Sequence, residues 1–285
     1  MNIILLIVSI FMGTGRSVFS KKMSSHTHKE RMFYINQSLF FVAAAAVLFL
    51  TNWNAFAKVS FFTVWYGAIY GMLVFIAQWS YTVALSRGTT SICAMIYSMA
   101  FVITTIVGVL FWNEPFGILA AVGLMLAIGA VTISAFSNEG KQKSGKGFLI
   151  PNLIAMLCGG CTGVLQKTHQ SSADKENLEA FLIVAFVTAA VLALGFACFC
   201  EKQRVQLQRE NIFSVCAGGC FGMASMLNTL LAGRLPSVVI FPVYNVGLMM
   251  LCLILGLVIF GEKPNKRQLL AFCIGIATIL VLSFK

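Results

Sequence analysis

Ten long apolar segments, separated by short polar breaks, restrict the fold of this chain more than any other feature. Each is close to the roughly 20 residues with which an α-helix crosses the ~30 Å hydrocarbon core of a bilayer. Lipid permits only helices or closed barrels, and barrel strands alternate polar and apolar residues, which these segments do not. The segments are residues 2–20, 33–50, 61–85, 89–112, 115–136, 147–166, 178–199, 212–232, 237–260 and 268–284. The sequence therefore predicts an all-α integral membrane protein of ten transmembrane helices.

The composition agrees with lipid as the surrounding solvent. Hydrophobic residues make up 59% of the chain and charged residues 10%, whereas soluble domains carry about 25% charged residues. The net charge of +11 does not indicate nucleic acid, because the basic residues lie in the breaks between apolar segments. Cys158 and Cys161 have the spacing of a redox or metal-binding pair, but no His or second Cys pair accompanies them in the same segment, so we interpret them as packing residues. His26 and His28 do not share one helix face, so they predict no metal site. We expect no metal, no cofactor and no nucleic-acid partner.

The chain also contains an internal repeat with a nearly constant offset. The equivalent residues, 146 to 148 positions apart, are Lys21 and Lys167, Arg87 and Arg234, Tyr97 and Tyr244, and Glu114 and Glu262. The offset divides the chain into residues 1–138 and 147–285, each with five apolar segments. Because five is odd, the second half enters the membrane from the side opposite to the first. The sequence predicts two five-helix units of inverted topology.

Inverted repeats are a recurring plan of secondary transporters, which bind their solute between the halves near the middle of the membrane. We therefore expect a secondary transporter, an exporter or exchanger of small polar organic metabolites. The alternative is a multipass receptor or scaffold without transport activity. A membrane enzyme would need a polar catalytic cluster, and the sequence has no such signature, so we do not expect an enzyme.

The ends of the two halves resemble each other and a known family. The first reads FVITTIVGVLFWNEPFGILAAVGLMLAIGAVTI and the second LMMLCLILGLVIFGEKPNKRQLLAFCIGIATILVL. An apolar helix, an acidic turn with proline and a second apolar helix resemble the EamA repeat of the drug/metabolite transporter superfamily. The resemblance implies two EamA units and transport of small organic solutes. A proline usual in the fourth helix of each unit has a counterpart only in Pro242, so the pattern does not support a bend in the first half.

The acidic turns of the two units contain Glu114 and Pro115 in the first half and Glu262 and Pro264 in the second. One interpretation is structural, with each carboxylate stabilised by the dipole of the helix that follows it. The other is coupling of transport to a proton or cation. Both acids lie at the edge of the membrane and are duplicated by the repeat, which favours the structural interpretation.

Six residues inside apolar segments are candidates for a solute pathway: Arg16, Gln78, Trp79, Tyr97, Tyr244 and Asn245. Arg16 either binds an anionic group of the solute or extends toward the interface near Lys21. Amides and hydroxyls in hydrocarbon need partners, so they face protein or a wet cavity. The other candidates therefore either join helices or line a cavity between the halves.

The breaks also predict an orientation. One side would hold Lys21, Lys22, Lys29, Arg31, Arg87, Lys141, Lys143, Lys146, Lys202, Arg204, Arg209, Lys263, Lys266 and Arg267, and the other Lys58, Lys167, Lys175, Arg234 and Lys285. Cytoplasmic breaks carry the excess of Lys and Arg, which places both termini outside the cytoplasm, whereas the EamA resemblance implies both inside. We expect the plasma membrane of a bacterium, contact with lipid, and a monomer or homodimer.

Overall fold

The computed structural model is a bundle of helices, and no strand occurs among the residues it describes. Apolar sequences of this length become helical in lipid because a helix satisfies its backbone hydrogen bonds within its own segment. The described residues are 2–23, 31–55, 59–88, 90–112, 114, 116–135, 147–200, 209–260 and 265–283.

Each expected apolar segment coincides with helical residues, and the fourth is divided into two helices. In chain order the helices are α1 (Asn2–Met23), α2 (Arg31–Thr51), α3 (Phe61–Arg87), α4 (Thr90–Ser98), α5 (Ala100–Trp112), α6 (Ile118–Ala135), α7 (Leu149–Ser171), the 3₁₀ turn η2 (Lys175–Asn177), α8 (Leu178–Phe199), α9 (Arg209–Ala232), α10 (Ser237–Phe260) and α11 (Lys266–Ser283).

Seven of the described helices are long and apolar enough to cross a membrane: α1, α2, α3, α7, α8, α9 and α10. Three shorter apolar helical stretches accompany them, at Ile96–Trp112, Ile118–Ala130 and Leu269–Leu282. Large apolar side chains such as Phe61, Leu110 and Phe199 are exposed on the outside of the bundle. An exposed apolar surface of this extent is the surface that lipid covers. The chain is therefore a multipass membrane protein.

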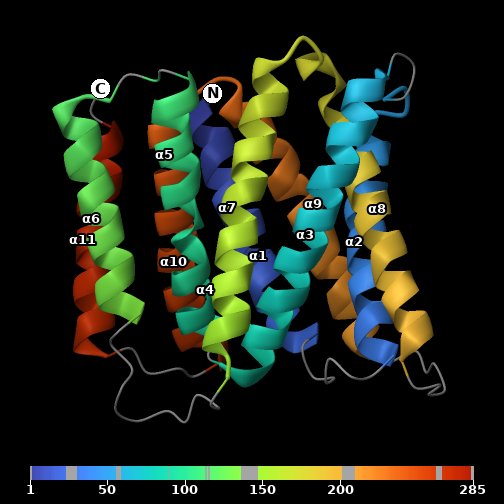
Figure 1. The fold of residues 1–285 in the computed structure, drawn as a ribbon. Coiled ribbons are helices and arrows are strands. Elements are labelled where there is room, and N and C mark those ends of the chain that lie inside the picture. The colour runs from blue at the N-terminus through green and yellow to red at the C-terminus, as the bar shows by residue number, and fades with distance from the viewer. Residues whose placement is uncertain are drawn as a thin grey trace.

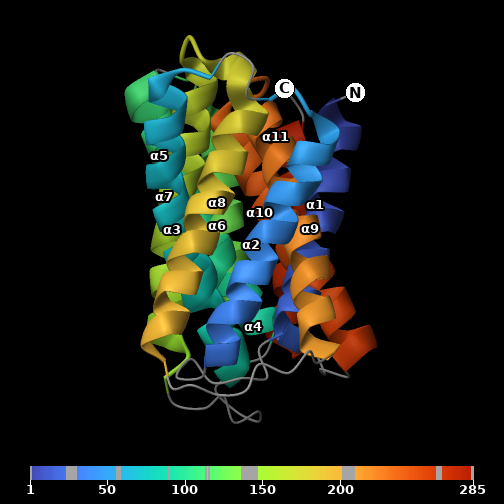
Figure 2. The ribbon, with the colours of Figure 1, turned by 90° about the vertical axis from the view of Figure 1, so that its right-hand side faces the viewer.

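Helices of the two sequence halves pack against each other throughout the bundle. α6 packs against α11 at one edge and α2 against α8 at the other (Figure 1). In Figure 2, α2 and α8 form the near edge of the bundle. Between the edges, α1 contacts α9 and α3 contacts α7, while α10 contacts both α4 and α5. The two halves are interleaved rather than placed side by side.

Glycines allow the closest of these helix contacts. A Cβ atom added to Gly71 of α3 would lie 2.3 Å from the backbone oxygen of Ala185 in α8, and one added to Gly218 of α9 would lie 2.0 Å from that of Phe40 in α2. No side chain fits at such distances, so the backbones touch directly. The Gly67-xxx-Gly71 and Gly218-xxx-Gly222 faces therefore pack within the chain.

The fourth apolar segment is interrupted at Met99, a position where no sequence pattern predicts a bend. The Met99 amide donates to the Ile96 carbonyl at 3.1 Å, and the Val102 amide donates to the Met99 carbonyl at 3.0 Å. These bonds span three residues instead of four, which tightens the helix locally without a proline. By contrast, α10 continues through Pro242, which lies close to its beginning. The proline pattern therefore did not identify the helix that is interrupted.

Candidate functional site

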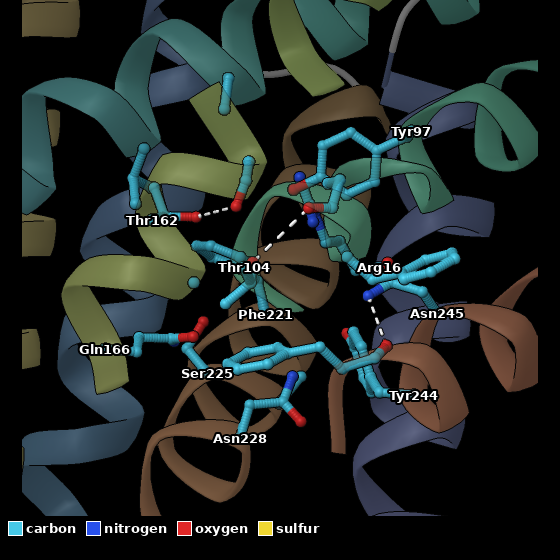
Figure 3. Close-up of a pocket in the computed structure, with 18 of the residues that line it drawn as sticks. Arg16, Tyr97, Thr104, Thr162, Gln166, Phe221, Ser225, Asn228, Tyr244 and Asn245 are labelled. Atoms are coloured by element: carbon cyan, nitrogen blue, oxygen red, sulfur yellow. Dashed lines mark hydrogen bonds between the residues drawn. The ribbon is translucent and has the colours of Figure 1, made fainter. Parts of the chain in front are cut away.

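A cavity lies inside the bundle, where helices of both halves meet (Figure 3). Its volume is about 70 Å³. Its lining comes from α1, α3, α4, α5, α7, α9 and α10. The lining residues with polar side chains are Arg16, Tyr70, Tyr97, Thr104, Thr162, Gln166, Ser225, Asn228, Tyr244 and Asn245. The cavity is polar although the helices around it are apolar.

Arg16 contributes the single positive charge among the described residues that line the cavity. Its side chain is 5% exposed, and its Nε and Nη2 atoms donate to Oε1 of Gln78 at 3.1 and 2.5 Å. The guanidinium also faces the rings of Phe221 at 4.5 Å and Tyr97 at 5.3 Å. A snorkelling side chain reaches the membrane interface, whereas this guanidinium is surrounded by protein groups inside the bundle.

Gln78 holds Arg16 and is itself held by hydroxyl groups. Its Nε2 atom donates to Oγ of Ser20 at 3.4 Å and to Oγ1 of Thr82 at 3.3 Å. These bonds turn the amide oxygen toward the guanidinium. Gln78 is fully buried and lies behind Arg16, outside the set of residues that line the cavity.

Trp79 does not reach the cavity, contrary to its selection as a pathway residue. It packs against the apolar cluster of α2, α3 and α8 that contains Phe75 and Phe186. Successive side chains on a helix point about 100° apart. Because Gln78 points to α1, its neighbour is directed to a different face of α3.

Tyr97 and Tyr244 line the cavity from opposite halves. Each hydroxyl lies over a glycine in the first helix of the other half. A Cβ atom at Gly159 would lie 3.0 Å from the hydroxyl of Tyr97, and one at Gly13 would lie 2.4 Å from that of Tyr244. Both glycines leave room for a phenol ring that a larger residue would displace.

The side-chain amides of Asn228 in α9 and Asn245 in α10 each make a hydrogen bond to another group of the protein. Asn245 donates from Nδ2 to the carbonyl of Phe241 at 2.8 Å within its own helix. Asn228 accepts at Oδ1 from Oγ of Ser9 in α1 at 2.7 Å. These contacts join helices and orient the two amides, both of which line the cavity.

The sequence interpretation missed several lining residues of α5, α7 and α9, namely Thr104, Thr162, Gln166 and Ser225. The hydroxyls of Thr and Ser commonly bond to their own helix, as Thr162 does to the carbonyl of Gly159 at 2.7 Å, and so give no distinct signal in the sequence. The amide of Gln166, at the end of its apolar segment, was a signal that could have been used. The repeat contained one usable indication. Thr162 lies 146 positions after Arg16, so the residue opposite the arginine was identifiable.

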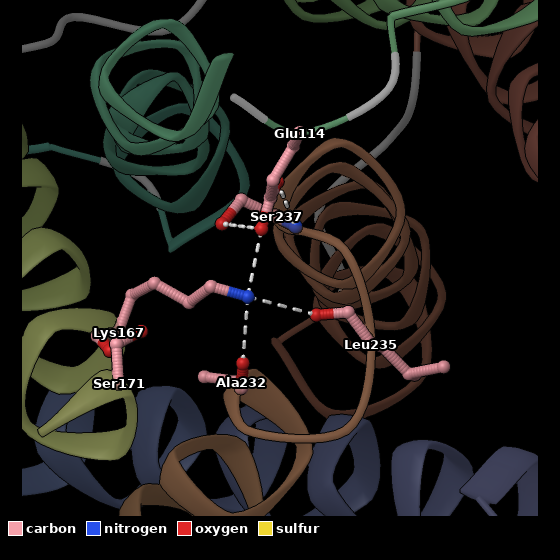
Figure 4. A network of polar contacts seen from close by, with 6 residues as sticks. All are labelled: Glu114, Lys167, Ser171, Ala232, Leu235 and Ser237. Atoms are coloured by element: carbon pink, nitrogen blue, oxygen red, sulfur yellow. Dashed lines mark hydrogen bonds and ion pairs between the residues drawn. The ribbon is translucent and has the colours of Figure 1, made fainter. Parts of the chain in front are cut away.

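A second polar group lies at the end of the bundle where α5, α7, α9 and α10 meet (Figure 4). Nζ of Lys167 lies 2.7 Å from Oε1 of Glu114 and donates to the carbonyls of Ala232 and Leu235 at 2.9 and 3.2 Å. The Ser237 amide donates to Oε2 of Glu114 at 2.6 Å. Glu114 thus stabilises the N-terminus of α10, not the helix that follows it in sequence.

Lys21 makes the matching contact at the opposite end. Its Nζ atom donates to the carbonyls of Leu85 and Gly88 at the end of α3. Pro115, Glu262 and Pro264, the remaining residues of the two acidic turns, lie outside the described residues.

Comparison with known proteins identifies the fold but no function. No family model matches the sequence, and no curated protein matches it. Among solved structures, 28 chains match. One, described as "Crystal structure of protein", has a TM-score of 0.75 and 14% sequence identity, with 98% of this chain and 95% of that chain covered. At this identity the likeness shows a shared fold over nearly the whole chain.

Proposed function

We propose that this chain is a secondary transporter of small polar organic metabolites, built from ten membrane-crossing helices in two inverted five-helix units of EamA type. The observation that carries the proposal is the polar cavity inside the bundle, to which both sequence halves contribute. A solute site between inverted repeats is the recurring design of secondary transporters. Polar side chains at this depth in a membrane protein are costly, and they commonly mark the pathway of a solute or ion.

Matching helix contacts support the inverted repeat. If α1, α2 and α3 correspond to α7, α8 and α9, the contact of α1 with α9 corresponds to that of α7 with α3. In the same way, the contact of α2 with α9 corresponds to that of α8 with α3. An exchange of partners of this kind is expected of two units related by a two-fold axis.

Matching side-chain contacts support the repeat at the level of single atoms. Lys21 binds the carbonyls of Leu85 and Gly88. Residues 146 or 147 positions later make the same arrangement, in which Lys167 binds the carbonyls of Ala232 and Leu235. Unrelated segments have no reason to reproduce a lysine bound to the same two carbonyl positions.

Solute counterflow in vesicles reconstituted with the purified protein tests the proposal. Thr162 lines the cavity, while its neighbour Cys161 is exposed on the outer surface of α7. Thr162→Trp fills the small cavity and is expected to abolish counterflow of a solute that the wild type carries. The matched variant Cys161→Trp adds the same ring on the outside and retains counterflow.

Two outcomes contradict the proposal. One is the absence of counterflow for every member of a broad metabolite panel, as expected of a receptor or scaffold. The other is equal counterflow in the wild type and in a folded Thr162→Trp variant, which would place the pathway elsewhere. Gel-filtration elution and unfolding temperature show whether each variant is folded.

A further inference from the structure

The cavity carries charge of one sign, and among the residues that the structure describes Arg16 has no carboxylate partner. No Asp or Glu is present among the described residues that line it, and the contacts of Arg16 are with neutral groups, the amide of Gln78 and the rings of Tyr97 and Phe221. A charge inside the membrane is costly unless it is paired. Arg16 lies about 5 Å from the midpoint of α1, at 1.5 Å per residue. The pairing partner is therefore a group that arrives from outside the protein.

The repeat places neutral residues where a second charge would be. Thr162 lies 146 positions after Arg16, and Ser225 lies 147 positions after Gln78. Both Thr162 and Ser225 line the cavity. The second half therefore offers hydroxyls, together with the amides of Gln166 and Asn228. One wall suits a single negative charge, and the other suits neutral hydrogen-bonding groups.

The surroundings of Arg16 favour a small planar anion. The guanidinium presents its donors in a flat fork that fits a carboxylate. The aromatic rings of Phe221 and Tyr97 beside it restrict the approach to that plane. The cavity volume of about 70 Å³ is small. A phosphate ester carries a second negative charge, for which the described lining residues offer no second cation.

We infer that the solute is a small monocarboxylate with net charge −1 whose carboxylate binds Arg16 and whose neutral polar end faces α7 and α9. This inference rests on the proposed transport function, because it identifies the solute of the same cavity. An amino acid fits less well, since its ammonium group finds no carboxylate among the described lining residues. Gln78 is a positioning residue that orients the guanidinium.

Binding to the detergent-purified protein tests the inference with three probes of equal size: 2-hydroxybutanoate, 2-hydroxybutanamide and 2-aminobutanoate. Isothermal titration is expected to show the hydroxy acid binding about tenfold or more tightly than either other probe, as one charge-assisted bidentate contact provides. Arg16→Gln should remove this preference without weakening the binding of 2-hydroxybutanamide. Arg16→Lys should retain part of it. Arg87→Gln, at the exposed end of α3, should leave it unchanged.

Equal binding of the three probes by the wild type would overturn the inference, and so would an unchanged preference in Arg16→Gln. If Arg16→Gln does not fold, inhibition of wild-type counterflow by the same three probes replaces the binding measurement. The hydroxy acid is then expected to inhibit most strongly, and equal inhibition by the three probes would overturn the inference. Failure of the transport proposal gives a different pattern, in which the acid binds through Arg16 but no solute crosses the vesicle membrane. Counterflow of neutral or zwitterionic solutes with no preference for the acid would support the transport proposal and contradict the inference that the solute is a monocarboxylate.

Discussion

At the scale of single residues, the site consists of one buried cation, Arg16, and of polar side chains from both halves that line the same cavity. Polarity and repetition in the sequence predicted part of this set. Tyr97 and Tyr244 were found because they are equivalent in the two halves, and both line the cavity. Arg16 was found as the one basic residue inside an apolar segment. Trp79 was misplaced because polarity in a sequence does not say which face of a helix a residue occupies. The hydroxyls of Thr104 and Thr162 were missed because threonine is common in apolar helices, where it bonds to its own backbone.

The partners of Glu114 could not be predicted from the sequence either. The dipole of the following helix was a local explanation, whereas the observed contacts, to Lys167 and Ser237, join residues 53 and 123 positions away. Long-range pairing of this kind depends on how helices assemble, and no local pattern records it.

Glu114→Gln is therefore expected to destabilise the bundle. The substitution removes the charge that pairs with Lys167 and weakens the bond from the Ser237 amide. We expect a loss of about 1–2 kcal/mol, seen as an unfolding temperature a few degrees lower in detergent. Glu176→Gln, at an exposed position in η2, serves as the control and should unfold at the wild-type temperature. Equal temperatures for both variants would show that the Glu114 network does not stabilise the bundle.

At the scale of elements, the apolar segments predicted where helices lie, with boundaries shifted by a few residues. The break between α4 and α5 was not predicted, because it arises from two i→i+3 hydrogen bonds at Met99 and not from a proline. It lies beside the cavity, between the lining residues Tyr97 and Ala100. Irregular backbone inside a membrane is tolerated where it borders protein or a wet cavity. The position of the helix break beside the cavity therefore explains how the membrane tolerates it.

The contact between α3 and α8 gives a prediction at this scale. Gly71→Ala places a methyl group against the carbonyl of Ala185, at 2.3 Å, and forces the helices apart. We expect a loss of about 1–3 kcal/mol, as for overpacked cores, measured by thermal unfolding. Gly195→Ala in α8 is the matched control, since a Cβ atom there meets nothing within 4 Å. That variant should be as stable as the wild type or slightly more stable, because alanine favours helix. A neutral Gly71→Ala would contradict the close packing.

At the scale of the whole molecule, the charges in the breaks predict the orientation. Figure 1 shows the N and C labels at the same end of the bundle. At the opposite end, Lys21 and Lys22 close α1, Arg87 closes α3, and Lys266 and Arg267 begin α11. The positive-inside rule assigns that opposite end to the cytoplasm.

A reporter fused after Lys285 is thus expected to lie outside the cytoplasm. An enzyme reporter active only in the periplasm should be active in this fusion, and one active only in the cytoplasm should be silent. A fusion within residues 137–146, in the break between the halves, is the control and should give the reverse. Cytoplasmic activity at the C-terminus would favour the orientation that the EamA resemblance implies.

Two-sided access to one cavity residue is what distinguishes a transporter from a receptor, and it tests the central claim most directly. Thr162→Cys, in a background without the nine native cysteines, places a thiol in the cavity. A variant that keeps only Cys161, exposed on the outer surface of α7, is the control.

A membrane-impermeant maleimide applied to right-side-out and to inside-out vesicles measures the access. We expect the cysteine at position 162 to react from both sides, with 2-hydroxybutanoate slowing both reactions, while Cys161 reacts from neither because lipid covers it. Reaction of position 162 from one side only, with and without solute, would contradict transport through this cavity.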